Sequence, residues 1–171
     1  MPAATRTVDP MIAELEQEAV ATRRMLERVP GDKLDWAPHP KSMTLGQLAY
    51  HVAGVCGDVS NFLETDEFDA QQARFMPDQP ESHAQIMEKF AEAQASARKR
   101  LEGLSDERAG ERWRLTNRSR EVFAVPKVAL VRTLMFNHLY HHRGQLSVYL
   151  RLLDIPVPVT YGRTADENPF A

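Results

Sequence analysis

Residues 126–155 read PKVALVRTLMFNHLYHHRGQLSVYLRLLDI, and this stretch decides the fold because it carries one long apolar stripe at helical spacing. Pro126 fits the first position of a helix, and Pro156 marks its end. Residues at helical intervals along the stretch share one face, and they are Val131, Met135, His138, His142, Tyr149 and Leu153. The stretch therefore predicts a long helix with this face turned toward a core.

Three stretches upstream show the same periodicity. The first, residues 9–30, opens on Asp9-Pro10 and is expected to stop near Pro30-Gly31. The second begins at residue 44 and the third at residue 82, and each opens with a Ser or Thr followed three residues later by Gln, which is a capping box pattern. Four such helices predict an all-α protein, an antiparallel four-helix bundle, with residues 1–171 forming a single domain.

The connections between these helices differ in character. Residues 32–43 contain Trp36 and several prolines, and we expect an ordered loop whose tryptophan plugs the bundle end. Residues 105–125 lose periodicity and become basic, which predicts a long loop with room for a short hairpin. Interspersed acidic residues weaken its positive field, so a solvated loop is favoured over a site for RNA or an anionic substrate. The tail after Pro156 is expected either to lie over the bundle surface or to extend freely into solvent.

Composition narrows the class of protein. The 171 residues are 43% hydrophobic and 26% charged, as in a soluble globular domain, and a net charge of −3 disfavours nucleic acid as a partner. Cys56 is the only cysteine, which excludes an intramolecular disulfide and fits a reducing compartment. Apolar runs are too short for a membrane span, and the start MPAATRTVDP lacks the apolar core of a signal peptide. We therefore expect a cytoplasmic protein without a membrane partner.

Three histidines point to metal chemistry. His138 and His142 lie about 40° apart around the fourth helix and about 6 Å apart along it, a spacing at which two imidazoles can chelate one divalent ion. His51 lies beside the apolar stripe of the second helix and can supply a third nitrogen, whereas His141 lies at the edge of its stripe. Three protein ligands with one open position are the arrangement that catalytic metal sites use.

Simpler interpretations exist for these and for other polar residues. The histidines could be satisfied core residues, but three unpaired imidazoles would each cost about 1–3 kcal/mol, which favours a metal. Leu139 stands where a zincin protease needs its glutamate, so peptide hydrolysis by that route is not expected. Cys56 lies about 140° around the helix from His51 and fits a small buried hydrophobe better than a ligand. Asp58 and Glu64 are expected to face water, so the sequence identifies no residue as a general base.

The string HLYHHRGQ at residues 138–145 resembles the signature of the DinB/YfiT-like metalloprotein superfamily. The resemblance extends to Trp36 and Pro38, to SMTLGQL at 42–48 with His51, and to VTYGRTADE at 159–167. It implies a four-helix bundle, usually a homodimer. Its divalent ion would be held by three side chains, which in this sequence are His51, His138 and His142.

Two neighbours of these histidines also match the motif. Gln145 would support a ligand histidine from outside the coordination sphere. Gly144 lies in the middle of a helix, where glycine costs about 1 kcal/mol relative to alanine, so close packing of another backbone, as at a dimer contact, would explain it.

The same resemblance suggests an activity. Characterised relatives include S-transferases and isomerases that use low-molecular-weight thiols such as bacillithiol, mycothiol or glutathione. The favoured hypothesis is thus a metal-dependent S-transferase that joins such a thiol to a small electrophile, with nickel, zinc, iron or manganese as the ion. A metal-dependent hydrolase and a non-catalytic, stress-related metal-binding dimer are the alternatives.

Overall fold

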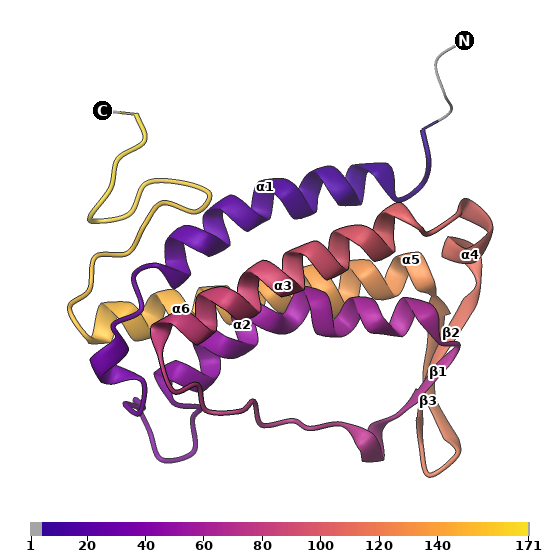
Figure 1. Cartoon of the computed structure of the whole chain (residues 1–171), viewed down its shortest axis with the longest axis horizontal. Coiled ribbons are helices and arrows are strands. Elements are labelled where there is room, and N and C mark those ends of the chain that lie inside the picture. The colour runs from indigo at the N-terminus through magenta and orange to yellow at the C-terminus, as the bar shows by residue number, and fades with distance from the viewer. Residues whose placement is uncertain (1–4, 171) are drawn as a thin grey trace.

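The computed structural model describes residues 5–170 and has an elongated helical bundle at its centre (Figure 1). The bundle consists of α1 (Asp9–Leu26), α2 (Leu45–Ser60), α3 (His83–Glu102) and a last long helix. That last helix runs through α5 (Lys127–Leu130), a π-helical segment (Val131–Asn137) and α6 (His138–Leu152). The predicted helical bundle is confirmed. Within residues 5–170, no helix is both long enough and apolar enough to span a membrane. The first four residues, part of the stretch that was expected to carry no export signal, lie outside the described residues.

Local capping explains where the helices begin and end. Thr44 and Gln47 form the predicted capping box, in which each side chain accepts a hydrogen bond from the backbone N–H of the other residue. Ser82 likewise accepts a hydrogen bond from the backbone of Gln85, and α3 ends at Gly103 as expected. These pairs satisfy N–H groups that the first turn of a helix leaves without partners.

The two ends of α1 differ from the prediction. Asp9 is already helical rather than the cap, because its carboxylate accepts a hydrogen bond from the backbone N–H of Arg6 at 2.8 Å. The helix ends at Leu26 and not near Pro30-Gly31, because Val29 donates its backbone N–H to the Leu26 carbonyl in a tighter turn. Such turns commonly close a helix.

The basic stretch 105–125 is more ordered than expected, because it contains a helix and most of a small sheet. Helix α4 (Asp106–Gly110) is followed by an antiparallel hairpin of β2 (Arg112–Asn117) and β3 (Arg120–Pro126), and β1 (Glu67–Asp69) pairs parallel to β2. Figure 1 shows the sheet at one end of the bundle. The hairpin turns at Arg118 and Ser119, which both have positive φ, 51° and 61°.

Buried side chains attach this sheet to the helices. Trp113 of β2 is fully buried, and its ring lies 5.5 Å from Phe62 and 6.2 Å from Phe123 between ring centroids. Lys127 is also fully buried, and its ammonium donates to Asp66 at 2.9 Å and Glu111 at 3.0 Å. A buried charge needs such partners, so the lysine joins the chain that leaves α2 to the start of α5.

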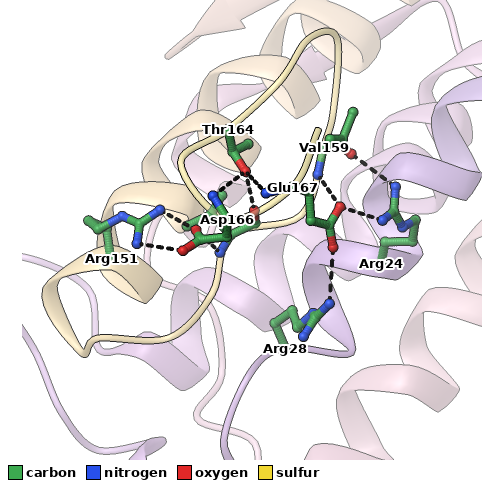
Figure 2. A network of polar contacts seen from close by, with 8 residues as sticks. Arg24, Arg28, Arg151, Val159, Thr164, Asp166 and Glu167 are labelled. Carbon is green, nitrogen blue, oxygen red and sulfur yellow. Dashed lines mark hydrogen bonds and ion pairs between the residues drawn. The ribbon is translucent and has the colours of Figure 1, made fainter. Parts of the chain in front are cut away.

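The tail from residue 156 to 170 has no helix or strand and folds back over α1 and α6, which is the first of the two expected arrangements (Figure 2). Glu167 accepts hydrogen bonds from Arg24 at 2.6 Å, Arg28 at 3.1 Å and the backbone N–H of Val159 at 2.8 Å. Asp166 is paired with Arg151 and accepts from the backbone N–H of Val157 at 2.8 Å. Two adjacent carboxylates therefore attach the tail to both helices.

Candidate metal centre

Helices α2 and α6 bring His51, His138 and His142 together. The ring centroids lie 4.9 Å apart for His51 and His138, 4.5 Å for His51 and His142, and 4.6 Å for His138 and His142. All three side chains are half-buried rather than enclosed in the core. The π-helical segment ends just before His138, and such segments are often found at functional sites.

The separation of the nitrogens tests whether the cluster fits an ion. One ring nitrogen from each histidine lies within 4.8 Å of the others, and the Nε2 atoms of His51 and His138 are 3.2 Å apart. A tetrahedral ion with metal–nitrogen bonds of about 2.0–2.1 Å holds its ligand nitrogens roughly 3.3–3.4 Å apart. The His51–His138 pair is within about 0.2 Å of this spacing, and the His142 nitrogen lies within 4.8 Å of both, so a small movement of the rings lets the donor set hold a divalent ion.

A neighbouring amide fixes which nitrogen of His142 is free. The Oε1 atom of Gln145 lies 2.7 Å from His142 Nδ1, and because a carbonyl oxygen only accepts, Nδ1 donates. The lone pair of His142 is therefore on Nε2. This is the supporting contact expected for Gln145, and outer contacts of this kind orient histidine ligands and raise their basicity.

The histidines are held in the neutral form that a metal requires. Burial, reinforced by positive charge on His142 and His138, lowers the pKa of His51 from 6.5 to about 4. Burial also lowers the pKa of His138, against a hydrogen bond with the Leu134 backbone that raises it. Burial lowers the pKa of His142 as well, against the hydrogen bond to Gln145. Near pH 7 all three imidazoles are thus available as ligands.

A surface hollow of about 260 Å³ opens beside the cluster, and His142 forms part of its wall. The other lining residues come from the loop before α2, from α2 and α6, and from the loop before α3; they are Lys41, Ser42, Met43, Leu48, Met76, Gln145 and Tyr149. Tyr149 is held in place because its hydroxyl donates to the Met43 carbonyl at 3.2 Å and its ring packs edge-on to Trp36 at 5.7 Å. A small molecule that enters this hollow can therefore contact His142.

The structure places the other sequence candidates away from the cluster. Cys56 is buried, and burial raises the pKa of its thiol to about 12, so it is the inert hydrophobe that was expected. Asp58 and Glu64 are exposed and pair with Lys89 and Arg100, in agreement with their expected contact with water.

The remaining histidines also stay outside the cluster. His141 is exposed, with its ring centroid 4.8 Å from that of His142. His83 bonds to the Leu26 carbonyl at 3.0 Å, and His39 is exposed.

The opposite side of α6 carries a buried ion pair that the sequence reasoning missed. Arg143 has only 2% of its side chain exposed and donates to Glu18 of α1 at 2.6 Å and to Thr22 at 2.9 Å. Tyr161 of the tail donates its hydroxyl to the same Glu18 carboxylate at 2.9 Å. The available signal was Glu18 itself, a charged residue within the apolar stripe of the first helix.

The close packing expected at Gly144 is not found within this chain. A Cβ added to Gly144 would meet nothing within 4 Å among the described residues packed around the helix, so no contact within this chain explains the glycine.

Comparisons with known proteins agree with this fold. A family model described as the DinB family matches residues 1–168. An uncharacterized protein of Bacillus subtilis strain 168, YrdA, is 27% identical over 169 residues, which cover 95% of this chain and 92% of that protein.

Two crystal structures of DinB-like proteins share the fold. One, from Bacillus cereus ATCC 10987, has a TM-score of 0.65 at 21% identity and covers 87% of this chain and 94% of its own. The other, YjoA from Bacillus subtilis, has a TM-score of 0.68 at 18% identity and covers 90% of this chain and 97% of its own.

Proposed function

Because this chain belongs to the DinB family, we propose that His51, His138 and His142 hold one divalent metal ion and that the protein is a metal-dependent thiol S-transferase. The observation that carries the proposal is the convergence of three neutral imidazoles beside an open hollow. Three protein ligands leave a coordination position for a substrate atom, whereas a structural site would be closed by a fourth ligand. Within residues 5–170, this is the one cluster of three such ligands.

The reaction needs a thiolate close to an electrophile. His51, His138 and His142 would hold the ion as neutral ligands, and its positive charge would favour the deprotonated form of a bound thiol. The thiolate sulfur then forms a bond to the electrophilic carbon, and the leaving group departs with the electron pair of the bond that breaks. The proton of the thiol passes to water, which reaches the half-buried cluster through the hollow.

The residues of this chain would orient these partners. Gln145 fixes the His142 ring so that its Nε2 lone pair stays available, and Tyr149 and Met43 form a wall beside it. Imidazole ligands alone select weakly among first-row metals, so nickel, zinc, iron and manganese are all candidates for the ion.

The test begins with metal content. Protein purified without chelator is analysed for metals beside the His51→Ala and His142→Ala variants, with His141→Ala as the matched control because that histidine is exposed beside the site. We expect about one divalent ion per chain in the wild type and the control, and loss of the ion in the other two variants. A wild type that binds no ion after incubation with nickel and zinc contradicts the proposal.

Activity is tested second, by screening small thiols against alkylating electrophiles. His138→Ala should abolish conjugation while the circular dichroism spectrum stays unchanged. If turnover requires no added thiol, the reaction is hydrolysis and the S-transferase assignment is wrong. If the His138→Ala variant keeps full activity, the site does not carry the reaction.

We also propose that two copies of the chain pair through an exposed stripe of α6. Gly144, Val148 and Leu152 follow each other at intervals of four residues, and the two apolar side chains are 56% and 57% exposed. Glycine at the first position would let a partner backbone approach closely. Light scattering should give a dimer mass for the wild type and a monomer mass for Val148→Lys. A monomeric wild type would contradict this pairing.

A further inference from the structure

We propose that the hollow beside His142 binds a small ligand with an apolar body and a carboxylate end, and that the ammonium of Lys41 pairs with this carboxylate. The inference rests on the proposed function, because it assigns a substrate class to the same site. Lys41 would be a specificity-determining residue in the wall of the hollow that also contains His142.

The size of the hollow sets the size of the ligand. Its volume of about 260 Å³ equals that of roughly eight or nine water molecules, at about 30 Å³ each. Sites for drug-sized ligands start at about 300 Å³, so the occupant is smaller than these. A chain of about six carbons with one polar group at each end matches the available space.

The walls of the hollow select an apolar body. Met43, Leu48 and Tyr149 present apolar surface from three different segments of the chain. Met76 adds a flexible apolar side chain to the wall and is 58% exposed. An exposed methionine beside an apolar wall is typical of a surface that covers an apolar ligand, because its side chain adapts to different shapes.

The charge of the hollow selects an anion. Lys41 is the only charged side chain among its lining residues, and none of the described residues in its wall is acidic. Within residues 5–170, the Lys41 ammonium makes no ion pair and is free to bind one. A divalent ion at the histidines would add further positive charge beside the hollow.

Four other surface hollows, formed by residues within the described range, lack this combination. The one between α3 and α4, of about 290 Å³, also contains cationic side chains, but its Arg100 is already paired with Glu64 at 3.1 Å. Three more have Glu167, Glu67 or Asp58 in their walls. Of these five hollows, the one beside His142 is therefore the one whose cation has no carboxylate in the wall to neutralise it.

The experiment measures dissociation constants by NMR titration on metal-free and zinc-loaded protein. The probes are hexanoate, 6-mercaptohexanoate and the uncharged 6-mercaptohexan-1-ol. Lys41→Gln removes the charge, and Lys99→Gln is the matched control because Lys99 is an exposed lysine that lines the hollow between α3 and α4. Both side chains are exposed, so neither replacement is expected to disturb folding.

On the metal-free protein, Lys41→Gln should raise the dissociation constants of both carboxylates about tenfold and leave that of the alcohol within about twofold. Lys99→Gln should change none of them. Equal weakening by both variants, no effect of Lys41→Gln, or no binding of either carboxylate overturns the assignment. Because this arm needs no ion, its failure is distinct from failure of the wild type to bind metal, which would overturn the proposed function.

The zinc-loaded arm identifies which substrate carries the carboxylate. If the thiol carries it, 6-mercaptohexanoate binds more tightly than either single-function probe, and hexanoate displaces the mercaptoalcohol. If the electrophile carries it, hexanoate and the mercaptoalcohol bind together. Both results support a carboxylate at Lys41 and assign it to different reaction partners.

Discussion

Replacing Gln145 by leucine should weaken metal binding without weakening the fold. The leucine has a similar size but cannot accept the hydrogen bond that His142 Nδ1 donates to Gln145 Oε1 at 2.7 Å. The His142 ring then loses the contact that fixes its orientation and its tautomer. Loss of an outer contact of this kind typically reduces metal affinity about 10–100-fold, which corresponds to about 1.4–2.7 kcal/mol.

The stability of the fold should change far less, because the Gln145 side chain is exposed. Surface replacements of this type usually alter the free energy of unfolding by less than about 0.5 kcal/mol. Competition for zinc with a chromophoric chelator at pH 7 measures the affinity, and urea denaturation of the metal-free protein measures the stability.

A second replacement separates orientation from packing. Gln145→Glu keeps an acceptor oxygen for His142 Nδ1 and adds negative charge, so its zinc affinity should equal or exceed that of the wild type. The reasoning is refuted if Gln145→Leu binds zinc within twofold of the wild type. It is refuted as well if Gln145→Glu is as weak as Gln145→Leu.

Three further predictions concern stability. Arg143→Met leaves the Glu18 carboxylate buried without its partner and should lower the free energy of unfolding by about 3–5 kcal/mol in urea denaturation, and the double variant with Glu18→Leu should recover most of the loss. In the metal-free protein the pKa of His51 is about 4, below its unfolded value of 6.5, so the unfolded chain binds more protons between these values and stability falls as pH drops through that window. The loss should be on the order of 2 kcal/mol after allowance for partial exposure, and His51→Gln should remove it from the pH profile measured by denaturation. Glu167→Ala removes the contacts with two arginines and a backbone N–H, so limited proteolysis should cut the tail faster, and an unchanged rate would show that these contacts do not hold it.

The helices could be predicted because their signals are local. The capping box at Thr44 and the end of α3 at Gly103 lie within a few residues of the backbone groups they satisfy. The end of α1 was predicted less well, since Pro30 permits a helix to end before it but does not require the end to fall there. The exact residue at which a helix ends depends on backbone hydrogen bonds that many different sequences can form, so the sequence alone does not determine it.

The sequence left room for a short hairpin in residues 105–125, but the position of its turn and the third strand could not be predicted because their signals are either absent or distant. A two-residue hairpin turn with positive φ at both positions is usually built from Asn-Gly or a similar pair, and this chain uses Arg118 and Ser119. The parallel pairing of β1 with β2 joins segments that are far apart in the sequence, and no local pattern marks it.

The metal cluster was within reach of sequence reasoning, whereas the hollow was not. Four residues separate His138 and His142, so a helix alone brings the rings together, and the position of His51 beside an apolar stripe turns it toward the same interior. Lys41 and Met76 come from two irregular loops, and their approach to His142 depends on how both loops pack against α2 and α6. Periodicity carries no information about such contacts.

Adjacent residues of α6 link the stability of the fold to the geometry of the site. His142 and Arg143 lie about 100° apart around the helix, so the first faces α2 and the cluster while the second faces α1. Arg143 holds α6 against α1 through Glu18, and Tyr161 of the tail bonds to the same carboxylate. Rotation of α6 that would separate His142 from His51 must therefore break a buried ion pair, which is costly because it leaves a charge without a partner. The ion pair on one side of the helix thus preorganises the imidazoles on the other, and the cluster can keep its arrangement before any ion binds.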